Sequence, residues 1–341
     1  MKIVVLAGGL SPERDVSLSS GSLIANALME NGHHVMLLDL YLGSGNPDFP
    51  PAFRDRSGGS AYSYRIPETE PDLEALKEVS GNGGQLIGRG VLEECLAADK
   101  VFLALHGSIG ENGQLQALFD TYGIPYTGTA YVGSLLAMDK DLSKKLLRLS
   151  GIPTADWRIL DLKKELSGQL AGLAYPCVVK PCSCGSSVGV TMVESEAELA
   201  SALHYAGKYE DAVLAEDKII GREFSVGILG GEALPPIEIK PRCGFYDYKN
   251  KYQSGLTEEV CPADITAAED TLLRSQALEV HNTLRLGYYS RIDFILDAAD
   301  VAWCLEANTL PGMTPVSLLP QEARAAGISY SELCEKISRG E

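Results

Sequence analysis

Residues 1–40, MKIVVLAGGLSPERDVSLSSGSLIANALMENGHHVMLLDL, contain the pattern that decides the fold class. The apolar run Lys2–Leu6 ends at a pair of glycines and predicts a buried strand. Apolar residues at helical spacing predict a helix from Ser17 to about Asn31, and His34–Leu40 predicts a second strand. A strand, a helix and a strand in this order indicate a parallel sheet with a right-handed crossover. The N-terminal domain is therefore expected to be of the α/β class.

Further along the chain, the pattern predicts an irregular excursion, a third strand and a second region of mixed helices and strands. Residues 43–90 are rich in Gly, Ser, Pro and charge, with one short helix expected around Asp72–Val79. Val101–Leu105 predicts the third strand, and Ile124–Gly128 closes the first domain. The other predicted helices are Gln114–Tyr122, Asp139–Ser150, Lys163–Leu173, Ala197–Ala206 and Ala267–Leu286. The other predicted strands are Trp157–Leu160, Cys177–Pro181, Val190–Val193, Val213–Glu216, Glu223–Leu229, Pro235–Lys240, Tyr289–Leu296 and Val301–Asn308.

Composition excludes several classes of protein. The chain has 341 residues, 45% of them hydrophobic and 22% charged, which suggests two or three globular domains. A net charge of −17 argues against nucleic acid or an anionic membrane as the partner, because both require a positive surface. The N-terminus turns to glycine and charge too soon for a signal peptide, and no apolar run is long enough to span a bilayer. We expect a cytoplasmic protein whose eight cysteines are reduced thiols.

The segment after the predicted strand Cys177–Pro181 is suited to binding phosphate. Lys180 lies at the strand end, and Cys182-Ser-Cys-Gly-Ser-Ser-Val-Gly189 follows as a loop of small residues. Glycines let backbone N–H groups approach an anion, and serine hydroxyls add donors. A plain Gly-Ser turn is an equal alternative at this point. The loop is not a Walker P-loop, and no dinucleotide fingerprint follows the first strand.

Two predicted strands near the C-terminus carry an all-oxygen constellation. Period-two alternation places Arg291 with Asp293, and Glu306 with Asn308, on one face each. A turn at residues 297–300 would put Arg291 opposite Glu306 and Asp293 opposite Cys304. Two carboxylates and an amide are ligands that Mg²⁺ prefers when it is held against phosphates. The alternative, a solvated hairpin face, is weakened by the apolar residues on both strands.

Two loops are further candidates. Residues 309–318, TLPGMTPVSL, form an irregular segment just past a strand end, where ligand sites of α/β proteins tend to lie. Residues 8–13, GGLSPE, leave the first strand, and Glu13 could either complement a helix dipole or hold a substrate ammonium. The sequence alone favours the first of these roles for Glu13.

In this order, these segments resemble the D-alanine–D-alanine ligase family of the ATP-grasp type. The resemblance covers nearly the whole chain. It rests on nine motifs: GGLSPERDVSLSSG, ALHGSIGENGQLQ, IPYTGT, MDKDLSK, VVKPCSCGSSVGV, FYDYKNKY, CPA, RIDF and EANTLPGMTPVSLLP. It implies a parallel-sheet substrate domain at 1–128, followed by a two-part ATP-grasp module at 129–220 and 221–341. It also implies a homodimer that joins two D-alanines through a D-alanyl phosphate for peptidoglycan precursor synthesis.

The resemblance assigns expected roles residue by residue. The expected catalytic residues are Glu13, Ser186, Tyr252, Arg291 and Gly312. The expected ATP contacts are Lys140, Lys180, Ser186, Glu216, Ile219, Glu223 and Lys251. The expected D-alanine contacts are Glu13, His106, Ser317 and Leu318. Asp293, Glu306 and Asn308 are expected to bind two Mg²⁺, with Mn²⁺ as a substitute and K⁺ as an additional candidate cation.

Three alternatives stay open. A ligase of the same family could use D-serine, or less readily D-lactate, as the second substrate; the pair Lys251-Tyr252 favours an amine nucleophile. A non-catalytic nucleotide or amino-acid sensor could use the same scaffold, although every lysine and carboxylate expected in the site is present. Cys182 and Cys184 replace polar or charged residues of many relatives, and they are interpreted either as small turn residues or as an oxidisable pair.

Overall fold

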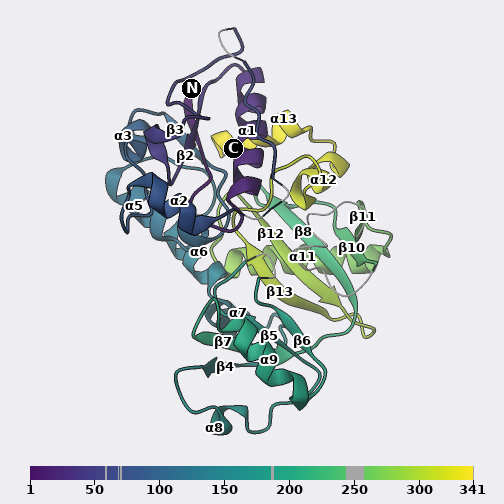
Figure 1. Ribbon diagram of the computed structural model, residues 1–341. Helices are drawn as coiled ribbons and strands as arrows, with labels where there is room; N and C mark the ends of the chain where they lie inside the picture. Colours follow the sequence, from purple (N-terminus) through teal and green to yellow (C-terminus); the bar gives the residue numbers. More distant parts are fainter. Residues whose placement is uncertain (58–59, 68, 70, 186–187, 243–256, 341) are drawn as a thin grey trace.

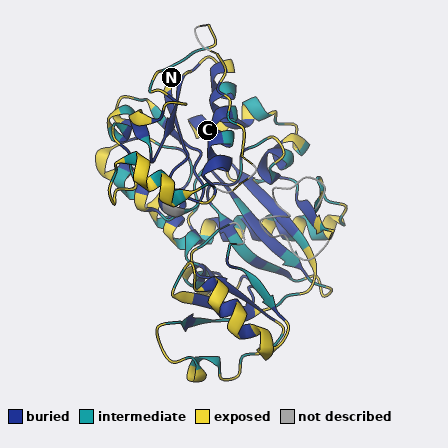
Figure 2. Ribbon diagram, in the orientation of Figure 1, coloured by how far each residue is buried: buried dark blue, intermediate teal, exposed yellow. Residues whose placement is uncertain are grey.

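Three β-sheets follow one another along the molecule in the part of the chain that the structure describes (Figure 1). The structure is a computed structural model, and it describes residues 1–340 except 58–59, 68, 70, 186–187 and 243–256. The strands of all three sheets are largely buried (Figure 2). Within the described part, no helix combines the length and the apolar character needed to cross a membrane.

The N-terminal sheet is parallel, with the strand order β2-β1-β3. Its strands are β1 (Lys2–Ala7), β2 (His34–Asp39) and β3 (Lys100–Leu103). Helix α1 (Arg14–Glu30) connects the first two strands and packs on both of them, as the β-α-β pattern predicts. The further elements of this domain are η1 (Gly43–Gly45), α2 (Leu73–Ser80), α3 (Val91–Leu96), α4 (Ser108–Glu111) and α5 (Gln114–Tyr122). The predicted α/β class is confirmed.

A four-stranded antiparallel sheet lies at the opposite end of the molecule, in the order β4-β7-β5-β6 (Figure 1). It comprises β4 (Trp157–Asp161), β5 (Cys177–Pro181), β6 (Thr191–Val193) and β7 (Ala212–Asp217), with α9 (Glu196–Ala206) packed on β5 and β6. The long helix predicted at Lys163–Leu173 is wrong, because only α8 (Ser167–Leu170) forms. Gly172 adopts φ of 71°, which an α-helix cannot contain, and the Arg158 guanidinium donates to the carbonyls of Ala171 and Gly172 in the loop that follows α8.

The central sheet has the order β11-β10-β8-β12-β13, with β9 paired to β8. Its strands are β8 (Arg222–Leu229), β9 (Glu232–Ala233), β10 (Ile237–Pro241), β11 (Thr257–Val260), β12 (Tyr289–Leu296) and β13 (Ala302–Asn308). Helix α11 (Ala267–Thr283) covers one face through apolar side chains, and α6 (Tyr131–Met138) and α7 (Lys140–Leu149) contribute to the same core. The opposite face carries polar residues, and we call it the site face; register places Ser225 beside Asp293 and Gly227 beside Arg291 there.

The hairpin β12–β13 differs from the prediction in its register. The expectation that Arg291 lies opposite Glu306 and Asp293 opposite Cys304 is wrong. A bulge directly after Asp293 shifts the pairing, so that Asp293 pairs with Glu306 and Arg291 pairs with Asn308. The bulge thereby brings the two carboxylates directly opposite each other on the site face. Sequence patterning cannot locate a single inserted residue of this kind, because both strands keep their apolar face buried on either side of it.

The last two helices, α12 (Leu318–Ala325) and α13 (Tyr330–Arg339), were not predicted. Helix α13 packs against α1 and completes the core of the N-terminal domain with Leu333, Cys334 and Ile337. A sequence signal for this helix existed, because Ser329 and Glu332 form a capping box at its start. Helices α3 and α6 were not predicted either, and no side chain caps the start of either helix.

A buried carboxyl lies between α12 and the site face. Glu322 is fully buried, and one of its oxygens accepts the N–H of Gly227 at 3.0 Å. A side chain at position 227 would clash, because its Cβ would lie 2.6 Å from Leu319 and 2.7 Å from the second Glu322 oxygen. Burial raises the pKa of Glu322 to about 8. The carboxyl is therefore largely protonated at neutral pH.

We expect Glu322→Gln to stabilise the protein increasingly as the pH rises. In the unfolded chain Glu322 loses its proton near the usual glutamate pKa, whereas the folded protein retains that proton up to about pH 8. The wild type therefore loses stability across this window, and the isosteric amide does not. Urea unfolding at pH 5 and pH 9 should show the advantage of Glu322→Gln growing by about 4 kcal/mol. A difference that is the same at both pH values would contradict this, and Glu258→Gln, at an exposed glutamate, controls for the lost charge.

Candidate active site

Two cavities open on the site face and meet at three shared residues. The first, of about 340 Å³, lies between the N-terminal domain and the central sheet, and we call it the N-terminal cavity. The second, of about 540 Å³, lies between the four-stranded and central sheets, and we call it the intersheet cavity. Both are lined by Lys140, Cys184 and Glu306. A group bound in one cavity can therefore reach a group bound in the other at this junction.

The residues expected to contact ATP gather in the intersheet cavity. Its lining includes seven of the residues expected to hold ATP or metal: Lys140, Lys180, Glu216, Ile219, Glu223, Asp293 and Glu306. Apolar side chains complete the walls, with Val178 and Met192 from one sheet and Leu305 from the other. A cavity with apolar walls and a few placed charges is suited to a planar base carrying an anionic tail. Ser186, Lys251 and Tyr252 lie outside the described residues.

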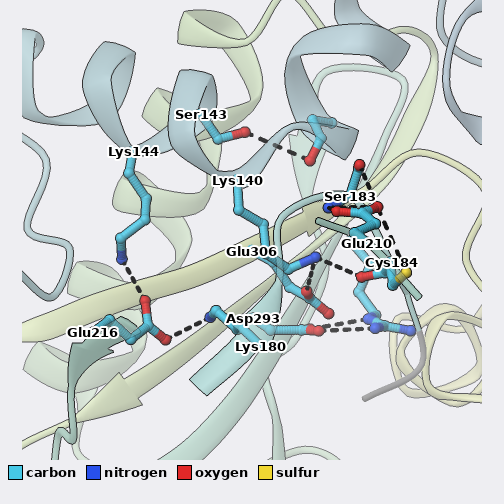
Figure 3. A network of polar contacts seen from close by, with 12 residues as sticks. Lys140, Ser143, Lys144, Lys180, Ser183, Cys184, Glu210, Glu216, Asp293 and Glu306 are labelled. Carbon is cyan, nitrogen blue, oxygen red and sulfur yellow. Dashed lines mark hydrogen bonds and ion pairs between the residues drawn. The ribbon is translucent and has the colours of Figure 1, made fainter. Parts of the chain in front are cut away.

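Glu216 on β7 lies between two lysines (Figure 3). Lys180 Nζ, from β5, lies 2.5 Å from one carboxylate oxygen, and Lys144 Nζ, from α7, lies 2.8 Å from the other. The side chains of all three residues are less than one tenth exposed. Burial alone would raise the pKa of Glu216, but the two ammonium groups outweigh it and hold that pKa below its usual value. The cluster carries a net positive charge beside the cavity.

Lys140 lies at the junction of the two cavities. It is the first residue of α7, whose N-cap is Asp139, and its backbone N–H donates to the Cys182 carbonyl. Its Nζ donates to the Cys184 carbonyl at 2.6 Å and lies 3.6 Å from a Glu306 oxygen. One lysine thus connects the small-residue loop with the hairpin. This places a positive charge where an anion would pass from one cavity to the other.

Asp293 is the most tightly held carboxylate of the site face. One of its oxygens accepts from the Ser225 hydroxyl at 2.8 Å and from Arg291 Nε at 2.9 Å. The other accepts from the second guanidinium nitrogen of Arg291 at 2.8 Å (Figure 3). The guanidinium therefore stands where a cation would bind. A cation could replace it without exposing an unpaired charge.

The donor set fits magnesium held jointly with a nucleotide. Asp293 and Glu306 face each other across the hairpin, and Asn308 follows on the same face, where its amide oxygen accepts the N–H of Leu310. Among the described residues, no group of three or more His, Cys, Asp or Glu is placed to enclose a metal by itself. Magnesium commonly takes only one or two carboxylates and completes its shell with phosphates and water, so these residues are sufficient.

The N-terminal cavity collects the residues expected to bind D-alanine. Its lining includes all four of them, Glu13, His106, Ser317 and Leu318, together with Arg291 and Gly312, which are expected to be catalytic. The loop that carries Glu13 is fixed by Arg14, which pairs with the fully buried Asp39 and donates to the Gly9 carbonyl at 3.0 Å. Within the second loop, Ser317 is 2.8 Å from the Thr314 hydroxyl. Both loops are therefore held by polar contacts.

His106 is buried in this cavity with one ring nitrogen directed away from any described partner. Burial lowers the pKa of His106, while the nearby Glu13 carboxylate raises it and Arg291 lowers it. The imidazole is thus kept neutral near physiological pH. A neutral ring with an unpaired buried nitrogen can accept or donate one hydrogen bond to a bound substrate.

Sequence reasoning missed Glu111, which also lines the N-terminal cavity. It lies in the quoted motif ALHGSIGENGQLQ, of which only His106 was selected. Its carboxylate accepts the N–H of Gly107. Burial, reinforced by Glu13, raises the pKa of Glu111 to about 8. Lys144 and Ser225 were missed as well, because neither lines a described cavity. Lys144 contacts Glu216, and Ser225 contacts Asp293, on the side away from the cavity.

The two cysteines of the small-residue loop do not form a reactive pair in this structure. Both are free thiols; Cys182 Sγ contacts Asp139 at 3.6 Å, and Cys184 Sγ contacts Glu210 at 3.7 Å. Burial raises the pKa of Cys182 to about 11 and that of Cys184 to about 12. The thiolate is the reactive form, so these values favour the role of small turn residues.

The fold and the paired cavities define an ATP-dependent ligase of the ATP-grasp class. Residues 2–129 match the family described as D-ala D-ala ligase N-terminus, and residues 146–338 match D-ala D-ala ligase C-terminus. The chain is 46% identical to a D-alanine–D-alanine ligase of Pediococcus pentosaceus (100% of this chain, 97% of that one) and 40% identical to one of Lacticaseibacillus casei (100% and 95%). The crystal structure of the Bacillus anthracis D-alanine–D-alanine ligase complexed with ATP superimposes with a TM-score of 0.77 at 30% identity, covering 100% of this chain and 97% of that one. The chain belongs to the D-alanine–D-alanine ligase family.

We expect Glu13→Gln to lower the pKa of His106 further. The Glu13 carboxylate is what raises that pKa against the effect of burial, and the amide removes its charge. Imidazole titration by NMR on histidine-labelled protein can measure this, with His106→Gln identifying the signal among the five histidines. His281, which lies on α11 and contacts Ser290 of β12, is the internal control and should titrate as in the wild type. A His106 pKa that rises in Glu13→Gln would contradict the placement of these two groups.

Proposed function

We propose that this protein joins two D-alanines to D-alanyl-D-alanine, with ATP converting the first into D-alanyl phosphate. The observation that carries the proposal is the junction of the two cavities at Lys140 and Glu306. ATP in the intersheet cavity and an amino acid in the N-terminal cavity would meet there, with the γ-phosphate beside the carboxylate. A carboxylate is a poor acyl donor, so phosphorylation is the step that makes it reactive.

The first D-alanine binds in the N-terminal cavity, beside Glu13 and His106. Glu13 supplies the counter-charge for the substrate ammonium, and the neutral His106 donates or accepts a hydrogen bond in the same pocket. Glu111, protonated at neutral pH, adds a donor rather than a second negative charge. This matters because the substrate's carboxylate must approach the phosphate without further repulsion. The pocket therefore orients the carboxylate toward Lys140.

Phosphoryl transfer then depends on positioning and charge neutralisation. Lys140 and Lys180 lie along the path of the phosphates, at the junction and inside the intersheet cavity respectively. Asp293, Glu306 and Asn308 would hold Mg²⁺, which supplies Lewis-acid neutralisation of the transferred phosphoryl group. Arg291 pairs with Asp293 in this structure and also lines the N-terminal cavity, from which it can contact the substrate carboxylate.

The second step is attack by the neutral amine of the second D-alanine on the acyl phosphate. Ser317 and Leu318 lie at the start of α12 and line the N-terminal cavity, and they would receive its carboxylate. Arg291 and the Gly312 backbone N–H then face the oxyanion of the tetrahedral intermediate, and phosphate leaves. Water must be excluded because it would hydrolyse the acyl phosphate. The expected roles of Ser186, Lys251 and Tyr252 in this step are part of the proposal.

The finer expectations belong to the same proposal. They are two Mg²⁺ with Mn²⁺ as a substitute, K⁺ as an additional cation, a homodimer, a cytoplasmic location, and the domain boundaries at 128 and 220.

The purified protein should release phosphate from ATP and Mg²⁺ when D-alanine is the sole amino acid added. Mass spectrometry should identify D-alanyl-D-alanine as the product. Competition at equal concentrations with D-serine or D-lactate should leave this dipeptide dominant. A dominant mixed product would move the chain to a different second substrate on the same chemistry. Absence of phosphate release under every condition would contradict the proposal and favour a sensor.

Ser225→Ala should raise the Mg²⁺ concentration needed for half-maximal activity by about tenfold. The Ser225 hydroxyl donates to Asp293 at 2.8 Å, so its loss leaves that carboxylate less well oriented for the cation. Activity at saturating Mg²⁺ should recover. Ser290→Ala is the matched control, because this equally buried serine of the same sheet contacts His281 instead of a carboxylate. An unchanged Mg²⁺ dependence in Ser225→Ala would count against Asp293 as a metal ligand.

A further inference from the structure

The carboxylate of Glu216 has one more lysine than it needs. Lys180 and Lys144 bind opposite oxygens of the same buried group, at 2.5 Å and 2.8 Å. A single ammonium would be sufficient to neutralise it, so the second requires a reason. Two like charges around one carboxylate also repel each other, and Lys180 contributes to the lowered pKa of Lys144.

The two lysines differ in what else holds them. Lys180 lines the intersheet cavity, and Glu216 is the one hydrogen-bond partner that the described structure gives it. Lys144 lines neither described cavity and lies on the far side of Glu216 (Figure 3). Its Nζ also donates to Thr154 Oγ1 at 2.8 Å, and that hydroxyl donates to the Cys304 carbonyl of β13 at 3.0 Å. Lys144 is therefore anchored, whereas Lys180 is held by Glu216.

This difference matters when a nucleotide enters. Lys180 can bind a phosphate or base only by weakening its bond to Glu216. If Lys180 were the sole partner, its departure would leave a buried carboxylate without a counter-charge, which is strongly unfavourable. With Lys144 in place, the carboxylate keeps one full partner. The residual pair is neutral, and the repulsion between the two lysines is relieved.

We propose that Lys144 is a positioning residue that serves as the permanent counter-ion of Glu216 and so releases Lys180 to bind the nucleotide. The proposal rests on the assignment of the intersheet cavity to ATP. It concerns affinity for ATP and not the chemical step, because Lys144 touches neither cavity. When the nucleotide draws Lys180 away from Glu216, Lys144 remains paired with that carboxylate. Without Lys144, the nucleotide would have to remove the only counter-charge of Glu216.

The competing explanation is that Lys144 merely fastens α7 to β13 through Thr154. Removal of Lys144 would then reduce stability, or reduce activity at every ATP concentration, and the identity of residue 216 would not matter. In the counter-ion role, removal of Lys144 instead leaves Glu216 bound to Lys180 alone. The loss of ATP affinity then depends on the charge of Glu216 and should largely disappear once that charge is neutralised.

The test uses four variants of the full chain: Lys144→Met, Lys145→Met, Glu216→Gln, and Lys144→Met combined with Glu216→Gln. Calorimetry with a non-hydrolysable ATP analogue and Mg²⁺ gives Kd, and D-alanine-dependent phosphate release gives KM for ATP and kcat. Lys144→Met should raise Kd and KM by about tenfold, with kcat at saturating ATP within about twofold of the wild type. Lys145→Met is the matched control, because Lys145 pairs with Asp141 at the exposed surface of the same helix, and its Kd should not change.

The double variant decides between the explanations. Because Glu216 lines the same cavity, the double variant is compared with Glu216→Gln: adding Lys144→Met to that variant should change Kd by less than about twofold, since an amide at position 216 no longer holds Lys180. A rise in Kd of about tenfold in the Glu216→Gln background, equal to that in the wild type, overturns the proposal, as does a wild-type KM in Lys144→Met. Should Lys144→Met not fold, Thr154→Val keeps both charges but removes the anchor of Lys144; it should raise Kd a few-fold, and an unchanged Kd overturns the proposal. A wild type that binds no ATP analogue would instead contradict the assignment of the cavity.

Discussion

The bulge after Asp293 is the constraint on which the site depends. It shifts the pairing of β12 with β13 so that Asp293 and Glu306 stand opposite each other, with Arg291 and Asn308 as the next pair. The apolar residues of both strands remain packed against α11, so the shift costs the core nothing in burial. Two carboxylates forced together in this way repel each other. Arg291 on one and Lys140 near the other offset that repulsion in the structure described.

The described lysines of the site are likewise paired with groups of opposite charge or with carbonyls. The chain has a net charge of −17, yet the site faces the phosphates of a polyanion with lysines that are already engaged. Lys180 is bound to Glu216, and Lys140 lies between a carbonyl and Glu306. Each lysine ammonium is thereby held in place by a protein partner until a phosphate competes for it. Placement of a few buried lysines, and not the overall charge of the protein, sets the local field.

Much of this arrangement could be predicted from the sequence, and the failures have physical causes. The β-α-β opening and the alternating hairpin strands are local patterns, and they indicated the class of fold and the residues Asp293 and Glu306. Lys180 was selected from another local pattern, a strand end followed by a loop of small residues. The predicted register of the hairpin differs from the structure by one residue already beside the turn, where Phe294 pairs with Cys304. The bulge after Asp293, which leaves no trace in alternation, adds a second residue. Lys144 was overlooked because its partner Glu216 lies far away in the chain and only the tertiary structure brings them together. Glu111 was overlooked because a glutamate among glycines in a loop is usually solvated, whereas this one is buried.

The position of α13 has a consequence for how the chain acquires its fold. The core of the N-terminal domain includes Leu333, Cys334 and Ile337 of α13, which packs against α1. During synthesis the first sheet and α1 therefore leave the ribosome with part of the apolar surface of α1 still uncovered. It remains so until residues 330–337 have been translated, and until then it is a surface for chaperones or for misassembly. The first domain by sequence is thus among the last to be completed.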